Sequence, residues 1–288
     1  MVNDASASIR PAVVAGLFYP DDPRELQQEL IRAFLAPLGP GYTPTVATTP
    51  ASRRIIGVVV PHAGYQYSGA AAAWSYAALA KYGRPAAVVL LGVNHHGVGA
   101  PLALSPATGW ATPLGVLPLA GTLAARLHEL APGVIPDMRA HAQEHSLEVQ
   151  APFLQYLFGE IPILPIAISR ATHEQLALLG QALAQLARET DLIIVASSDF
   201  SHYITQSQAE RLDGLALARI VDIDPIGLYT TVHEHEITMC GVAPVTVMLF
   251  AAQALGAQSA QMLHYHTSGD VTGDRRQVVG YGAAAIYR

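Results

Sequence analysis

The sequence has one cysteine, few charges and no long apolar run, and each shortage excludes a class of protein. Cys240 alone cannot form an internal disulfide, so we expect a reducing, cytoplasmic location. Only 13% of the 288 residues are charged, the net charge is −6 and the basic residues are scattered, so we expect no nucleic-acid partner. The longest apolar stretch, Val242 to Ala257, is interrupted by polar residues and predicts no membrane span. The N-terminus lacks the basic and apolar regions of a secretory signal.

Common catalytic and cofactor motifs are also missing. The sequence contains no Walker loop, no Gly-x-Gly-x-x-Gly turn, no Gly-x-Ser-x-Gly elbow, no His-Glu-x-x-His pair and no paired Cys-x-x-Cys. These absences disfavour a phosphate cradle, serine hydrolase chemistry and a structural zinc site. With 51% hydrophobic residues, however, the chain is well able to bury a sizeable core.

Strand-like and helix-like segments alternate along the chain, which predicts an α/β fold with a central, mainly parallel sheet flanked by helices. We expect one domain over residues 1–288, with a flexible tail at 1–9 and a loop or lid at 37–54, where Pro, Gly and Thr are frequent. The expected strands are 55–60, 87–92, 163–168, 192–196, 260–266 and 279–287, with short extended pieces at 102–105 and 116–119. The expected helices are 22–35, 69–81 after a Ser68 cap, 122–130, 146–158 after a Ser146 cap, 173–188, 206–220, 225–233 and 243–255.

Histidines follow three of the predicted strands. His62 comes just after strand 55–60, His95 just after strand 87–92, and Asp199 and His202 just after strand 192–196. The carboxyl ends of parallel strands are where open α/β sheets bind ligands, and neutral imidazole is the commonest side-chain metal ligand. The histidines could therefore share one ion, although hydrogen bonds that cap the turns would explain His62 and His95 as well.

Two further residues have both a structural and a functional interpretation. Cys240 could be a buried structural thiol, the usual fate of a lone cysteine, or a metal ligand or nucleophile activated by the start of the helix that follows it. In the run Glu144-His145-Ser146-Leu147-Glu148, a helix start would explain Ser146 as the cap and Glu148 as a first-turn carboxylate. His145 is not explained in that way and could line a cleft.

The chemistry left open is a metal site with two histidines and an acidic or thiolate third ligand. Two histidines and one anionic ligand with open positions are typical of non-haem iron oxygen chemistry. A thiolate in place of a carboxylate makes the site more favourable for Cu(I) or Zn(II) as well as for iron.

Five motifs, in order and in register, resemble the Memo family. The resemblance covers the chain from about residue 10 to the C-terminus and includes Arg10-Pro11 and Gly16-x-Phe18-Tyr19-Pro20 near its start. The five motifs are Pro61-His62-Ala63-Gly64-Tyr65-x-Tyr67-x-Gly69, Gly92-x-Asn94-His95-His96, Glu144-His145-Ser146-x-Glu148, Ser197-Ser198-Asp199-Phe200-Ser201-His202 and Cys240-Gly241.

The resemblance implies a fold similar to that of class III extradiol ring-cleaving dioxygenases, in which two histidines and a glutamate hold ferrous iron. It implies a metal site made of His62, His95 and Cys240, with Asp199 and His202 beside it. Cysteine then replaces the iron-binding glutamate, which argues against catechol cleavage. Eukaryotic relatives are described as copper- or iron-binding redox proteins and as adaptors for phosphotyrosine peptides, and bacterial relatives are associated with radical-SAM partners.

Three functions therefore remain open at the level of sequence. The first is a redox or oxygen-dependent enzyme that binds Fe(II) or Cu, with Zn also possible, in which His202 is the general acid/base, Asp199 orients it and His145 lines the pocket. The second is a non-catalytic module that binds a peptide or a radical-SAM partner and retains only a vestigial dioxygenase site. The third is a true extradiol dioxygenase with an altered ligand set. The substrate, a small molecule or a peptide, is not specified by the sequence.

Overall fold

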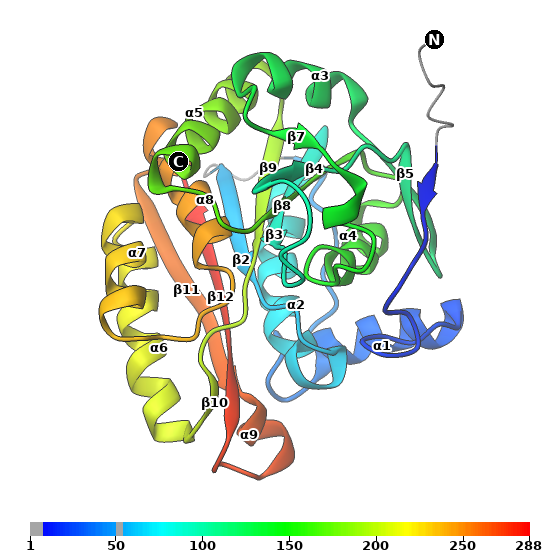
Figure 1. Cartoon of the computed structure of the whole chain (residues 1–288). Coiled ribbons are helices and arrows are strands. Elements are labelled where there is room, and N and C mark those ends of the chain that lie inside the picture. Colours follow the sequence, from blue (N-terminus) through cyan, green and yellow to red (C-terminus); the bar gives the residue numbers. More distant parts are fainter. Residues whose placement is uncertain (1–7, 50–53) are drawn as a thin grey trace.

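A central sheet with helices on both faces organises the chain, and the computed structural model describes residues 8–49 and 54–288 of it (Figure 1). Within these residues, nine strands form one sheet in the order β10-β12-β2-β9-β3-β8-β4-β7, and β11 pairs with β12. The strands of this sheet are β2 (Ile55–Val60), β3 (Ala87–Val93), β4 (Leu102–Leu104), β7 (Ile135–Pro136), β8 (Ile163–Ile168), β9 (Leu192–Ser197), β10 (His202–Ile204), β11 (Ser259–Thr267) and β12 (Val278–Tyr287). A smaller sheet contains β1 (Ile9–Arg10), β5 (Gly109–Thr112) and β6 (Gly115–Pro118).

The four central strands are parallel and almost completely buried. β2 and β3 both pair in parallel with β9, and β8 pairs in parallel with β3. Every residue of β2, β8 and β9 is buried, as expected for β-branched runs that are covered on both faces. The flanking pairs β12·β2 and β4·β8 are antiparallel. The α/β fold class is thus confirmed, in the form of a mixed sheet with a parallel centre.

Helices cover both faces of the sheet. One hydrophobic core joins the sheet to α5, α6, α7 and α8, and a second joins it to α1, α2 and α4. The helices are α1 (Pro23–Leu35), α2 (Tyr65–Tyr82), α3 (Gly121–Leu130), α4 (Ala151–Phe158), α5 (His173–Glu189), α6 (Gln206–Val221), α7 (Pro225–Glu234), α8 (Val242–Ala254) and α9 (Ser268–Thr272), with 3-10 turns η1 (Met138–Ala140) and η2 (Glu148–Gln150). Among the helices of the described residues, none is both long and apolar enough to cross a membrane.

Two of the predicted helix starts are wrong because their serines serve other contacts. The helix expected after Ser68 begins at Tyr65, one turn earlier, and the Ser68 hydroxyl donates back to the Ala63 carbonyl. The helix expected from residue 146 begins at Ala151, after the 3-10 turn η2. The Ser146 hydroxyl donates to the Val93 carbonyl at the end of β3 instead of capping a helix.

The tail and loop predictions fall partly on residues that are not described. Residues 1–7 and 50–53 lie outside the described ranges. Ile9 pairs with Gly109 in the strand pair β1·β5, so the regular structure begins before residue 10. Residues 37–49 contain no helix or strand, and two hydrogen bonds attach them to α2: Trp74 donates to the Leu38 carbonyl and Ala47 to the Ala80 carbonyl. Their role as a lid stays a prediction.

Candidate metal centre

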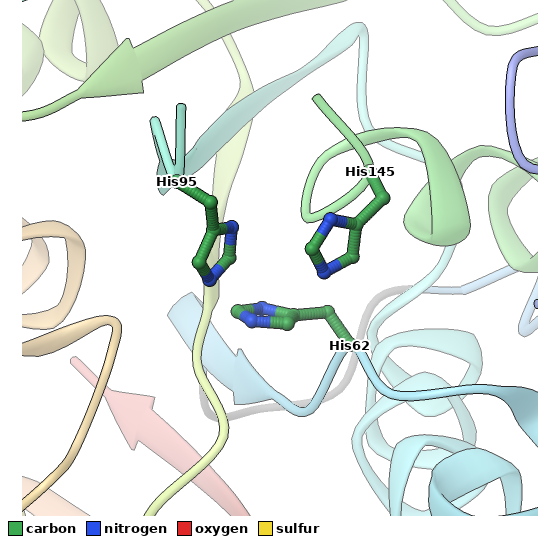
Figure 2. Close-up of side chains that lie close together, drawn as sticks. All are labelled: His62, His95 and His145. Carbon is green, nitrogen blue, oxygen red and sulfur yellow. The ribbon is translucent and has the colours of Figure 1, made fainter. Parts of the chain in front are cut away.

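Three histidines converge at the carboxyl ends of the central strands (Figure 2). His62 follows β2, His95 follows β3, and His145 lies in the loop between η1 and η2. One ring nitrogen from each residue lies within 4.8 Å of the others, and within the described residues this is the one group of three potential ligands that is so close together. The His95 and His145 rings are stacked with centroids 4.6 Å apart, and the His62 ring lies edge-on to both. The three residues could therefore hold a metal ion.

The His62 ring is held by a network that determines which nitrogen carries the proton. Its Nδ1 lies 2.9 Å from the Ser197 hydroxyl oxygen. Ser197 donates its single hydroxyl proton to the Ser146 carbonyl, at 2.7 Å, and accepts from the Gln150 amide. The Ser197 oxygen can therefore only accept from His62, so Nδ1 of His62 is the protonated nitrogen and Nε2 keeps its lone pair.

Glu144 determines the position of the ring proton of His95 in a similar way. Its carboxylate accepts from the His95 backbone N–H at 2.7 Å and lies 2.9 Å from His95 Nδ1. It also accepts from the Ser146 backbone N–H at 2.8 Å. Burial alone would raise the pKa of Glu144, but the contacts with His95 and the Ser146 N–H hold it at about 2. An ionised carboxylate accepts only, so Nδ1 of His95 carries a proton, and in the neutral ring Nε2 is the nitrogen that keeps its lone pair.

Burial favours the neutral form of the His62 and His145 imidazoles. It lowers the pKa of His62 well below the usual histidine value, and the neighbouring His145 and His95 lower it further. Burial likewise lowers the pKa of His145 to about 4, against the opposing charge of Glu144. A neutral ring is the form that binds a metal, so both residues are prepared for this role near pH 7.

Cys240 contacts the histidine cluster through His62. Its Sγ lies 3.2 Å from His62 Nε2 and 3.5 Å from the Asp199 carbonyl oxygen. The thiol lies just before α8. Burial and the charge of Asp199 raise the pKa of the thiol, so the helix start does not activate it in the way that one of the two interpretations required. Close packing of Gly241 brings the residue into place: a Cβ on Gly241 would lie 2.3 Å from the Ser198 Cβ and 2.4 Å from the Ser197 carbonyl oxygen.

Asp199 and His202 lie beside the histidines, but each is held by a partner that we did not expect. Asp199 accepts from the His62 backbone N–H at 2.7 Å, and burial raises the pKa of its carboxyl to about 6. The hydrogen bond that orients His202 comes from its Nδ1 to the Thr238 carbonyl oxygen at 2.9 Å. Because a carbonyl only accepts, Nδ1 of His202 carries the proton and Nε2 is available. Asp199 therefore supports the turn at His62, and Thr238 orients His202.

The sequence placed His62 and His95 correctly at strand ends, but His202 is the first residue of β10, and the order of the strands across the sheet was not predicted. β9 lies between β2 and β3, so His62 and His95 flank the strand that leads to Asp199 and His202. His145, which we assigned to the pocket wall, is one of the three nitrogens in reach of a single ion. Sequence reasoning missed Glu144 and Ser197 as partners of the rings. The signal for Glu144 was its place next to His145, but the contact with His95 spans 49 residues.

The sequence is similar to known proteins along almost its whole length. The family model described as Memo-like protein matches residues 10–285. The chain belongs to the Memo family. A MEMO1 family protein of Methanopyrus kandleri is 41% identical over 97% of this chain and 99% of its own length. Those of Ignicoccus hospitalis and Methanothermobacter thermautotrophicus are 43% and 42% identical, over 96% and 95% of this chain and 97% and 98% of their own lengths.

A solved structure supports the fold of this Memo-family protein. An uncharacterized protein from Escherichia coli K12 aligns with 80% of this chain and 99% of its own length, with a TM-score of 0.55. Its sequence identity is 17%, so the likeness concerns the fold alone.

Proposed function

We propose that this Memo-family protein holds iron or copper through His62, His95 and Cys240 and uses it in redox or oxygen-dependent chemistry. The observation that carries the proposal is the close approach of Cys240 to Nε2 of His62. This atom carries a free lone pair, lies 3.2 Å from Cys240 Sγ, and belongs to the residue that groups with His95 and His145. His145 lines the pocket as a further nitrogen in reach.

The spacing between His62 and Cys240 fits one ion. A transition metal lies about 2.0 Å from an imidazole nitrogen and about 2.3 Å from a thiolate sulfur, so such a nitrogen and sulfur on one ion stand at most about 4.3 Å apart. The 3.2 Å between His62 Nε2 and Cys240 Sγ is inside this limit. By the same sum, two imidazole nitrogens on one ion stand at most about 4.0 Å apart, and the three histidine nitrogens lie within 4.8 Å of one another.

The donor types suit iron, copper and zinc. Two neutral imidazoles and one thiolate give a site with a single anionic ligand, and thiolate selects for soft metals such as Cu(I) as well as for iron and zinc. When bound, iron or copper would supply one-electron chemistry with oxygen or another oxidant. A cation at this position would also offset the cost of burying the Cys240 thiolate.

The remaining polar side chains are suited to moving a proton and holding the site. His202 accepts a proton at Nε2, because its Nδ1–H is committed to the Thr238 carbonyl. Asp199 holds the backbone of His62. The lone thiol at this site is compatible with a reducing environment, and we infer a cytoplasmic location from it.

Anaerobic loading with Fe(II) followed by nitric oxide tests the proposal. We expect the EPR signal of a non-haem iron–nitrosyl in wild type, its loss in H62A, and its retention in H202A, in which oxygen-dependent turnover should be lost. H128A, which changes an exposed histidine on α3, should behave as wild type. A silent spectrum from folded wild-type protein, together with no Cu(II) signal after copper loading, would contradict the proposal.

A further inference from the structure

One short segment, residues 144–146, takes part in the hydrogen bonds that hold both strand-end histidines. Glu144 accepts from His95, and the Ser146 carbonyl accepts the hydroxyl proton of Ser197, whose oxygen then accepts from His62. The residue between them, His145, adds its own ring to the cluster. The segment therefore connects to all three histidines at once.

We propose that Glu144 and Ser197 are positioning residues that hold His95 and His62 as Nδ1–H tautomers, so that Nε2 of each is left for the shared site. The inference rests on the proposed metal-binding function for its purpose, but the tautomers themselves are properties of the metal-free chain. A metal-ligating histidine depends on such a partner for its ring orientation and basicity, and loss of the partner typically costs 10–100-fold in metal affinity.

The role of Glu144 depends on its having two accepting oxygens. Oε1 accepts from His95 Nδ1 and the Ser146 N–H, and Oε2 accepts from the His95 backbone N–H. A glutamine offers one accepting oxygen and one NH₂ group. If its oxygen takes the Oε2 position, the NH₂ faces His95 Nδ1 and donates to it, which moves the ring proton to Nε2 and blocks the nitrogen that a metal needs.

The role of Ser197 depends on where its proton goes. The Ser146 carbonyl can only accept, and the Gln150 NH₂ can only donate, so both fix the Ser197 oxygen as an acceptor toward His62. The Gln150 amide is itself oriented, because its oxygen accepts from the Tyr76 hydroxyl. Ser197 is fully buried at the end of β9 and pairs there with Val60, two residues before His62.

The buried ion pair of Arg10 and Glu148 also stabilises the segment 144–146. Arg10 donates to the Glu144 carbonyl oxygen and to the Glu148 carboxylate, both at 2.6 Å. Gly92 lets the segment approach β3, since a Cβ there would lie 2.8 Å from the Ser146 hydroxyl oxygen and 2.6 Å from the Leu147 side chain. These contacts hold Glu144 and Ser146 at the distances that the two hydrogen-bond chains require.

Two-bond ¹H–¹⁵N correlation spectra of metal-free, full-length protein labelled with ¹⁵N-histidine test the assignment directly. The spectra are recorded near pH 8, where neutral imidazole predominates, and signals are assigned with H62A and H95A. We expect the Nδ1–H tautomer for both residues in wild type. In E144Q the His95 signal should leave the pure Nδ1–H pattern while His62 is unchanged, and in S197A the His62 signal should leave that pattern while His95 is unchanged. An Nε2–H tautomer at either residue in wild type would overturn the assignment for that residue.

Metal affinity, measured with Fe(II) alone by competition against a chelator, supplies the second readout. We expect a 10–100-fold loss of affinity in E144Q and in S197A. The matched controls are E160Q, which changes an exposed glutamate before the amino end of β8, and S75A, which removes a buried hydroxyl that donates to the Val59 carbonyl; both should bind as wild type. Wild-type affinity in E144Q or S197A would overturn the positioning role of that residue. If wild-type protein binds no metal but shows the Nδ1–H tautomer at both His62 and His95, the proposed function is refuted and the tautomer assignment stands.

Discussion

Arg10 and Glu148 form an ion pair that is almost completely buried, and its removal should be costly. The side chains are each 1% exposed, and Arg10 Nη1 lies 2.6 Å from Glu148 Oε2. In R10M the Glu148 charge keeps three donors, the Tyr19 hydroxyl and the backbone N–H groups of Val13 and Val14, but loses its counter-ion. Removing one partner of a buried pair typically costs about 3–5 kcal/mol of unfolding free energy.

The double variant R10M/E148M separates the lost charge from the lost hydrogen bonds. It leaves no buried charge at this place, but it leaves the Tyr19 hydroxyl and two backbone N–H groups without an acceptor, at about 1–3 kcal/mol each. We therefore expect the double variant to be less destabilised than the sum of R10M and E148M by about 2–3 kcal/mol, yet not to recover wild-type stability.

Equilibrium urea unfolding at pH 7 measures these differences. The control is R32M, which breaks the Arg32–Glu29 pair on α1, where the arginine side chain is 63% exposed and the expected cost is at most about 1 kcal/mol. A cost in R10M no larger than that in R32M, or strict additivity of the two buried substitutions, would refute the account of this pair.

Two further substitutions and one change of conditions test other parts of the structure. G241A should displace the Cys240 turn, because its Cβ would lie 2.4 Å from the Ser197 carbonyl oxygen; metal uptake should fall and unfolding by urea should become easier by about 1–3 kcal/mol, whereas G214A on α6, where a Cβ meets nothing within 4 Å, should fold normally. Lowering the pH should destabilise the chain, because burial lowers the pKa of His141 to about 4 from 6.5, so the unfolded state binds the extra proton between these values and stability falls as pH drops through that window. This residue alone contributes a loss of about 2 kcal/mol between pH 7 and pH 5, and the slope of stability against pH in urea titrations should be shallower in H141Q; an equal slope would contradict the assignment.

The parts of the fold that depend on local pattern were predictable. Strands β2 and β8 begin and end at the predicted residues, because β-branched runs with a proline at one boundary, Pro61 and Pro162, specify a buried strand locally. The same reasoning predicted that His62 and His95 follow strand ends, whereas His202 begins the short strand β10. The order of the strands, with β9 between β2 and β3, follows from packing across the whole chain and was not available from the spacing.

The features that could not be predicted depend on contacts between distant residues. Ser146 and Glu148 look like the start of a helix, but their side chains bond to Val93 and Arg10, more than 50 residues away. For Cys240, the local signal was a helix start that lowers a thiol pKa, whereas burial and Asp199 raise it. The ligand set of His62, His95 and Cys240, the acid/base role of His202 and the lid role of residues 37–54 remain predictions.

Metal content measures the central claim most directly. Protein purified anaerobically without a histidine tag would be analysed by mass spectrometry, with wild type beside H62A, H95A, C240S and H128A. We expect close to one iron or copper per chain in wild type and H128A, and its loss in the other three variants. Retention of metal in C240S, with loss of metal in H145A analysed in the same way, would replace the thiol by the third histidine in the ligand set. No metal in wild type, and none taken up on titration with iron or copper, would contradict the account.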